Sequence, residues 1–261
     1  MDFAQANAAS ELLIEHWRNG TTLAALPPPL RPADRVDGYL IQAQIEKLSK
    51  QPLFGWKIAA TSRAGQQHIA VDGPLAGRLL SEMVHTDGAT IHLGANRMRV
   101  AEAEFAFRMR RDLSPRAEPY GIEEVLDAVA ALHLAIEVPD SRFDNFTVVG
   151  AAQLIADNAC AHQFVLGPEA PSMWRDVDLA SHRVIGQVGT RLSREGFGVN
   201  VLGDPRFALV WLVNELSHHD LTLAANQVVT TGTCLVPLEI REGDEVSADY
   251  GTLGRMRMQF A

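Results

Sequence analysis

The chain has 261 residues, 47% of them hydrophobic and 21% charged, which is typical of a globular protein with one large core and a small appended unit. Its formal net charge of −9 and the lack of any run of Lys or Arg argue against a nucleic-acid partner. The first residues do not resemble a signal peptide, and no segment has the roughly 18 uninterrupted apolar residues of a membrane span, so we expect a cytoplasmic protein with no membrane partner.

Two helices are expected near the N-terminus. Residues 3–18 form an Ala-rich helical pattern that Asn19-Gly20 ends. After three consecutive prolines, a second helix should begin near Asp34, with one apolar stripe formed by Val36, Leu40, Ile41, Ile45 and Leu48. We therefore predict a helical N-terminal unit over residues 1–52 and a larger, β-rich domain over residues 53–261.

The larger domain begins with short strands and turns. Its first strand carries Lys57 between two apolar neighbours, a setting in which a lysine usually extends to the surface. A short helix is expected over residues 62–69, and the turn over residues 71–74 could close over a ligand. Asp72 could contact that ligand or only cap the turn, and the residues alone leave both alternatives open.

Two carboxylates lie one residue apart in the apolar segment 99–107. Side chains alternate faces along a strand, so Glu102 and Glu104 should point the same way, about 7 Å apart along the backbone. Two adjacent anions are unfavourable unless a cation lies between them, and a divalent ion bound through oxygen would provide that charge. A solvated edge strand is the simpler alternative for an isolated Glu-x-Glu.

A third carboxylate follows about thirty residues later. Glu137 comes at the end of another apolar run, and the apolar residues between 122 and 134 recur at helical spacing. We therefore expect a helix over residues 122–134 that leads to the strand carrying Glu137. Three acids on two core strands could form one face of an oxygen-rich site for Mg²⁺ or Mn²⁺.

The remaining elements are expected in the C-terminal half. The short polar side chains of residues 157–160 suit a loop that lines a pocket. Asp204-Pro205 is typical of a helix start, for a helix that runs to His218. Strands are expected over residues 227–233, 245–250 and 255–260, and the last two should form a hairpin.

The histidine, glycine and cysteine patterns of the sequence lack the residue spacing of a zinc, nucleotide or nucleophile site. The nine histidines include no His-Glu-x-x-His, and the glycine pairs lack dinucleotide or Walker spacing, so neither zinc nor a nucleotide cofactor is expected. Cys160 and Cys234 are expected to be free thiols. A Cys160 nucleophile activated by His162 is not expected, because their spacing on a loop assures no contact.

Five motifs in order make the chain resemble a known family over nearly its whole length. They are Gly-Trp-Lys-Ile-Ala-Ala-Thr-Ser at 55–62, Val-Asp-Gly-Pro at 71–74, Glu-Ala-Glu at 102–104, Glu-Val-Pro-Asp-Ser-Arg at 137–142 and Ala-Asp-Asn-Ala at 156–159. The chain resembles the 2-keto-4-pentenoate hydratase and 4-oxalocrotonate decarboxylase family, relatives of fumarylacetoacetate hydrolase. The resemblance implies an α+β fold, in which a helical N-terminal unit precedes a curved, mixed β-roll.

The resemblance also implies roles for individual residues. The metal ligands for Mg²⁺ or Mn²⁺ would be Glu102, Glu104 and Glu137. Lys57 falls on the family's active-site lysine, which reverses the surface interpretation, and Asp72 is the second candidate catalytic residue. The substrate would contact four further residues, Asp157, Asn158, Cys160 and Thr231.

The implied activity is that of a lyase in aromatic-compound catabolism. A metal that chelates the C1 carboxylate and C2 oxygen of a 2-hydroxy-2,4-dienoate would stabilise a dienolate, and water would then add at C4. Decarboxylation of 4-oxalocrotonate through the same dienolate is the alternative, because one site can serve either reaction. Leu75 and Cys160 stand where some hydratases carry polar residues, which leaves the exact reaction and the substrate tail open.

A rival from another class is a non-catalytic subunit that binds an oxo acid, which the intact Lys57 and three glutamates argue against. The resemblance further suggests a homo-oligomer, possibly complexed with a pathway partner enzyme.

Overall fold

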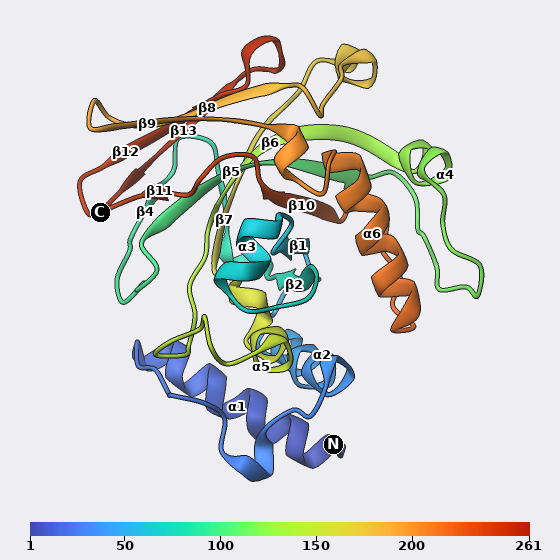
Figure 1. The fold of residues 1–261 in the computed structure, drawn as a ribbon, viewed down its shortest axis with the longest axis vertical. Helices are drawn as coiled ribbons and strands as arrows, with labels where there is room; N and C mark the ends of the chain where they lie inside the picture. Colours follow the sequence, from blue (N-terminus) through green and yellow to red (C-terminus); the bar gives the residue numbers. More distant parts are fainter.

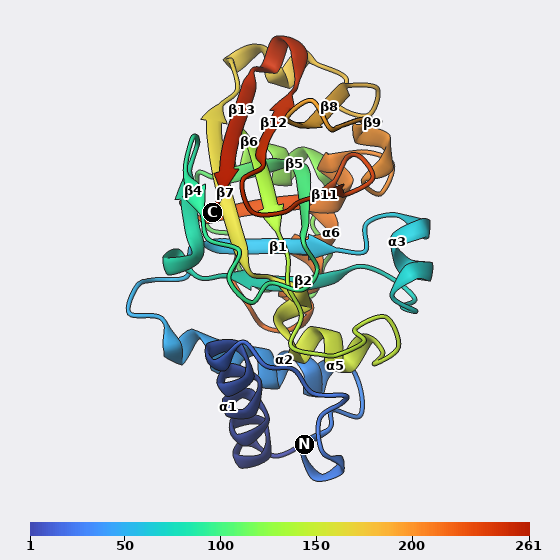
Figure 2. The ribbon, with the colours of Figure 1, turned by 90° about the vertical axis from the view of Figure 1, so that its left-hand side faces the viewer.

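The computed structural model describes the backbone of residues 1–261 and every side chain except that of Leu48. Two curved β-sheets lie above a group of N-terminal helices, and α3 projects from the side of the molecule near the end of β1 (Figures 1 and 2). The helices are α1 (Phe3–Asn19), α2 (Arg35–Ala43), α3 (Arg63–His68), α4 (Ile122–Asp127), α5 (Ala151–Ala156) and α6 (Pro205–His218). Among the described residues, every helix is too short or too polar to cross a membrane.

The larger sheet holds the strands that carry the predicted site. Its order is β2-β1-β10-β5-β6-β7-β3, with β11 paired to β5. These strands are β1 (Gly55–Ala59), β2 (Leu75–Leu79), β3 (Val84–Thr86), β5 (Val100–Met109), β6 (Val129–Val138), β7 (Gln163–Glu169), β10 (Val228–Thr233) and β11 (Leu238–Glu239). Parallel and antiparallel pairs both occur, since β1 runs parallel to β10 and β5 antiparallel to β6.

The smaller sheet is built mainly from the C-terminal part of the chain. Its order is β4-β13-β12-β8-β9. The strands are β4 (Thr90–Ile91), β8 (Arg183–Val188), β9 (Leu192–Phe197), β12 (Glu245–Asp249) and β13 (Arg255–Phe260). The expected C-terminal hairpin is confirmed, because β12 and β13 pair antiparallel from Glu245 opposite Gln259 to Asp249 opposite Arg255.

The helix boundaries follow the local capping signals. Asp2 caps the start of α1, and Gly20 ends it in the left-handed conformation at φ 61°. Asp34 caps α2 by accepting from the backbone N–H of Asp37. Asp204 and Pro205 begin α6, which runs to His218 as the sequence predicted and buries its apolar face.

The expected apolar stripe of the second helix is partly wrong. Val36 is 59% exposed, whereas Ile41 and Ile45 are buried. The buried face of α2 passes through Gly38, which packs closely against α5. A Cβ atom at this position would lie 2.6 Å from the carbonyl oxygen of Ala152. This close packing, and not the spacing of the apolar residues, therefore decides which face of α2 is buried. The side chain of Leu48 lies outside the described part.

The N-terminal helices share their core with a later part of the chain. The cluster that buries Ala9, Leu13 and Ile41 also contains Phe143 and Ala156, from beyond residue 52. The boundary at residue 52 therefore stays a prediction, because this core crosses it.

The helix expected over residues 122–134 is wrong beyond Asp127. The helix α4 ends there, and β6 begins at Val129. This strand lies between β5 and β7 and is buried on both faces except at Ala130, so nearly every residue is apolar. A continuous apolar run matches the helical and the strand period equally well, so periodicity could not separate the two.

Candidate active site

Strand pairing brings the three predicted metal ligands together. Glu102 of β5 lies opposite Glu137 of β6 in the antiparallel register, and Glu104 follows two residues along the same face. One carboxylate oxygen from each residue lies within 4.8 Å of the other two. Glu104 and Glu137 are buried, and Glu102 is half-buried.

The buried carboxylate oxygens are incompletely satisfied. Glu104 accepts through Oε2 from the Thr230 hydroxyl and from the Gly232 N–H at 2.8 Å. Within the described residues, Glu104 Oε1 and Glu137 Oε2 have no hydrogen-bond partner, and Glu137 Oε1 has only an ion pair with Lys57 Nζ at 3.0 Å. Buried anionic oxygens without partners are unfavourable, and a set of carboxylates suits Mg²⁺ or Mn²⁺. The residues present therefore fit a divalent cation.

Burial and mutual repulsion raise the pKa values of the acids in this cluster. Burial, with the negative charge of Glu137 as the second cause, raises the pKa of Glu102 to about 7. Burial also raises the pKa of Glu104 and of Glu137, which Lys57 opposes. Burial lowers the pKa of Lys57, but the charges of Glu137 and Glu102 outweigh it and raise that pKa above its usual value.

We expect chelator-treated protein to lose stability, relative to a Glu102→Gln variant, as pH rises from about 4.5 to about 7. Because the pKa of Glu102 is higher in the folded protein, the folded state binds more protons in this window, and rising pH removes that advantage. Glutamine does not titrate. Urea unfolding of both proteins across the window measures the difference, and parallel stability curves would contradict the prediction.

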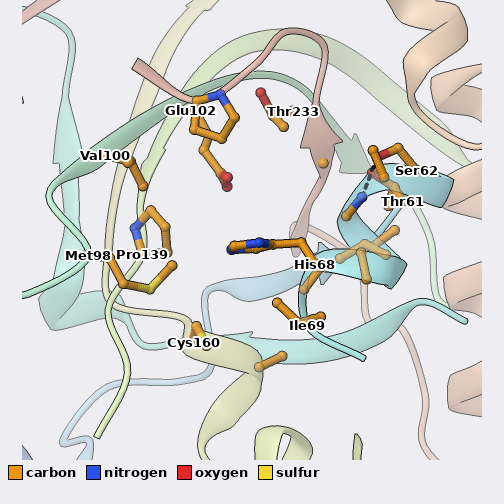
Figure 3. A pocket seen from close by; sticks show the side chains of 18 of the residues that line it. Thr61, Ser62, His68, Ile69, Met98, Val100, Glu102, Pro139, Cys160 and Thr233 are labelled. Atoms are coloured by element: carbon orange, nitrogen blue, oxygen red, sulfur yellow. Dashed lines mark hydrogen bonds between the residues drawn. The ribbon is translucent and has the colours of Figure 1, made fainter. Parts of the chain in front are cut away.

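A cavity of about 830 Å³ opens beside the cluster. Lys57 and Glu102 contribute polar groups to its wall, and most other lining side chains are apolar, including Met98, Val100 and Leu235. In Figure 3 the Glu102 carboxylate and the His68 imidazole both project into this open space. A mainly apolar cavity with a few convergent polar groups is typical of a small-molecule site.

Cys160 is the one predicted substrate contact that lines this cavity. Burial raises the pKa of its thiol to about 12, so the sulfur stays protonated and is a poor nucleophile. His162 instead lies against Trp17, with ring centroids 5.6 Å apart. Both cysteines are free thiols, as expected.

The other predicted substrate contacts, Asp157, Asn158 and Thr231, lie outside the cavity lining, so their contact with a substrate stays a prediction. Asp157 accepts from the Ser141 hydroxyl at 2.7 Å and forms an ion pair with the Arg142 guanidinium. Thr231 donates its hydroxyl to the Phe105 carbonyl at 2.9 Å. Because side chains alternate along β10, it is the adjacent Thr230 that contacts the cluster.

The structure also does not bring Asp72 to the cavity. Its side chain is 88% exposed and lies 3.4 Å from Arg35 Nη1 at the surface. The turn that carries it leads from α3 to the buried strand β2 and leaves the carboxylate in solvent.

Asn158 holds a turn that contacts the active-site lysine. Its side chain accepts from the Arg78 N–H at 2.7 Å and donates to the Arg78 carbonyl at 2.9 Å. Asn158, Ala159 and Cys160 all have left-handed backbones, at φ 54°, 49° and 61°. Each such residue other than glycine costs about 1–2 kcal/mol. The turn directs the Ala159 carbonyl to Lys57 Nζ, which donates to it at 3.0 Å.

Replacing Asn158 with Ala is expected to lower the free energy of unfolding by about 2–4 kcal/mol. The change leaves the buried N–H and C=O of Arg78 without partners, and each unsatisfied group costs about 1–3 kcal/mol. Urea unfolding measures the loss. The control Asn145→Ala removes an exposed loop asparagine and should cost less than about 1 kcal/mol. Equal losses in the two variants would contradict the role of the Asn158 side chain.

Two functional residues could not be assigned from the sequence. Alternation along the strand over 227–233 could have separated Thr230 from Thr231, but only once the register with Glu104 was known. His68 ends an expected helix without any flanking motif, and only the position of α3 beside the cavity singles it out.

The mixed β-roll, with three clustered glutamates beside a buried lysine, points to a family of metal-dependent enzymes that act on small oxo acids. The chain belongs to the fumarylacetoacetate (FAA) hydrolase family, whose C-terminal domain model matches residues 63–261. It is similar to 2-keto-4-pentenoate hydratase of Burkholderia vietnamiensis, with 33% identity over 252 residues that cover 95% of this chain and 94% of the relative. The enzyme of the same name from Paraburkholderia phymatum is 32% identical over 244 residues, covering 92% and 91%.

The fold is also that of a solved relative. The structure of 4-oxalocrotonate decarboxylase from Pseudomonas putida G7, complexed with magnesium and adipate, matches with a TM-score of 0.90 at 23% identity and covers 100% of this chain and 99% of the relative. These matches confirm the family and the α+β fold that the sequence predicted.

Proposed function

We propose that the protein is a metal-dependent hydro-lyase that adds water to 2-hydroxy-2,4-dienoates of the 2-keto-4-pentenoate type. The observation that carries this proposal is the set of partly unsatisfied carboxylates of Glu104 and Glu137, clustered with Glu102, which lines a large, mostly apolar cavity. The similarity to hydratases over nearly the whole chain supports it.

The three glutamates would hold the metal, Mg²⁺ or Mn²⁺. When bound, a divalent cation supplies Lewis-acid stabilisation of negative charge on the substrate's C1 carboxylate and C2 oxygen. Glu104 is kept in place by the Thr230 hydroxyl and the Gly232 N–H, so its free oxygen Oε1 is already oriented.

Lys57 would hold and move a proton at the C2 oxygen of the substrate. Its ammonium is fixed between Glu137 Oε1 and the Ala159 carbonyl, each at 3.0 Å, and only 3% of its side chain is exposed. In its amine form, which a cation bound at the cluster would favour by offsetting the charges of Glu137 and Glu102, Lys57 can take the proton of the 2-hydroxyl and return it later to C3. The apolar side chains of Met98 and Val100 limit the water that reaches the substrate.

Decarboxylation of a 4-oxalocrotonate-type substrate is the second candidate. It is favoured by Leu75 and Cys160, which line the cavity with apolar or protonated groups where some hydratases carry polar ones. The pairing of Arg194 with Glu239 at 2.9 Å argues for the hydratase, because a second substrate carboxylate needs a free cation. Arg97 also lines the cavity, donates to Thr22 and forms no ion pair among the described residues, so it is the lining arginine that remains for such a carboxylate.

The test is turnover by the purified chain with Mg²⁺ or Mn²⁺. A panel of 2-hydroxydienoates and 4-oxalocrotonate is followed by the loss of the conjugated absorption and by CO₂ release. Loss of dienoate absorption without CO₂ supports the hydratase, and CO₂ from 4-oxalocrotonate alone supports the decarboxylase. No turnover of any substrate would overturn both in favour of a non-catalytic subunit. Light scattering of the same sample tests the proposed homo-oligomer, and any pathway partner enzyme stays a prediction.

A further inference from the structure

His68 projects into the cavity beside the glutamate cluster. It is the last residue of α3, the short helix that projects from the side of the molecule (Figure 2). Its imidazole reaches toward the open space that the Glu102 carboxylate also enters (Figure 3). The ring packs against Phe146 at a centroid distance of 6.0 Å and an interplanar angle of 70°, and it forms no hydrogen bond to another described side chain. Both ring nitrogens are therefore free to contact a bound molecule.

Most other ionisable groups of the cavity have contacts or roles of their own. Lys57 is tied to Glu137, Glu102 belongs to the glutamate cluster, and Arg194 is paired with Glu239. Arg97 donates to Thr22 and carries a permanent charge, so it transfers no proton. The Cys160 thiol stays protonated, because burial raises its pKa to about 12. Among the described residues that line the cavity, His68 alone offers an imidazole, a group that can both donate and accept a proton.

The proposed reaction needs proton transfers at both ends of the diene. Ketonisation breaks the O–H bond at C2 and forms a C–H bond at C5, which leaves a double bond between C3 and C4. Water then loses a proton and bonds to C4, and the electron pair of that double bond moves toward the C2 oxygen until C3 is protonated. Lys57, held within the cluster, can exchange protons with O2 and C3. Proton transfer to C5 and from the attacking water requires a second proton-transfer group.

We propose that His68 is this second catalytic residue, an inference that rests on the proposed hydratase function. The imidazolium gives its proton to C5 while the 2-hydroxyl proton passes to the neutral amine of Lys57. The neutral imidazole then takes a proton from the water that adds to C4, and Lys57 returns its proton to C3. Each side chain ends the cycle in its starting protonation state, and the substrate has gained one water. Contact with Phe146 holds the ring for this exchange.

The test compares His68→Gln and His68→Ala with wild type and with Gln67→Ala, which changes an exposed neighbour on α3 that does not line the cavity. The substrate is 2-hydroxyhexa-2,4-dienoate in D₂O, with Mn²⁺. Protonation of its C5 from one face places deuterium in a single configuration, which NMR of the 4-hydroxy product reports. Melting temperatures and Mn²⁺ affinities of all four proteins are measured alongside, because both His68 variants should fold and bind metal normally.

We expect both His68 variants to lose about 10²-fold in kcat and to give a mixed configuration at C5, since solvent then delivers deuterium from either face. Added imidazole should restore part of the rate of His68→Ala, and Gln67→Ala should match wild type. A wild-type rate with an unchanged single C5 configuration in His68→Gln would overturn the role of His68 and leave the hydratase standing. Wild-type protein that turns over no dienoate would overturn both.

Discussion

Replacing Lys57 with Met is expected to lower kcat by about 100-fold or more in protein that remains folded and binds metal. Methionine fills a similar apolar volume, so the packing around this side chain, which is 3% exposed, is kept. The change removes the amino group that lies 3.0 Å from Glu137 Oε1 and with it the group that exchanges a proton at the C2 oxygen. Steady-state kinetics of metal-loaded protein on a verified dienoate give the measurement.

Two further variants separate charge from proton transfer. Lys57→Arg keeps a cation, but a guanidinium does not release its proton, so we expect its kcat to stay low if Lys57 moves a proton and to recover if the lysine acts only through charge. Lys50→Met removes an exposed lysine and should behave as wild type. Wild-type turnover by Lys57→Met would show that the metal and the remaining residues suffice.

The sequence predicted those parts of the site that depend on local pattern. Strand alternation placed Glu102 and Glu104 on one face, and the apolar run before Glu137 identified a core strand. The register that sets Glu137 opposite Glu102 follows from the pairing of β5 with β6, for which the sequence carried only the resemblance to a family. The strand β6 itself was partly mistaken for a helix, because burial on both faces erased the period that tells the two apart.

The short motifs did not reveal what their polar side chains contact, because the contacted residues lie elsewhere in the chain. Asn158 is bonded to Arg78, eighty residues earlier, and so supports Lys57 through the turn at Ala159 instead of lining the cavity. Asp157 likewise forms an ion pair with Arg142, 15 residues earlier, and not a contact in the cavity lining. A polar residue in a motif signals that its side chain is used, and only tertiary contacts distinguish a ligand contact from a structural support.

Replacing Glu137 with Gln is expected to lower the affinity for Mn²⁺ by about tenfold or more, with the fold retained. The ligand charge count sets the affinity of a carboxylate site, and even supporting residues around a metal contribute 10–100-fold. Both buried oxygens of Glu137 lack a hydrogen-bond partner among the described residues, and only Oε1 has an ion pair, with Lys57. The amide of glutamine keeps the shape of this strand position but removes the charge. Titration calorimetry measures the affinity of each protein.

The matched control is Glu239→Gln, which removes one negative charge from the same cavity but from a residue paired with Arg194. If the cation binds at the cluster, Glu102→Gln and Glu104→Gln should weaken Mn²⁺ binding as Glu137→Gln does, while Glu239→Gln changes it little. The melting temperature of wild type should fall on chelation, because binding at one hundred times Kd stabilises the folded state by about 2.7 kcal/mol. Equal Mn²⁺ affinity in all four variants and wild type would instead place the cation outside the cluster. The buried carboxylates of Glu104 and Glu137 would then have to be protonated, as their raised pKa values allow.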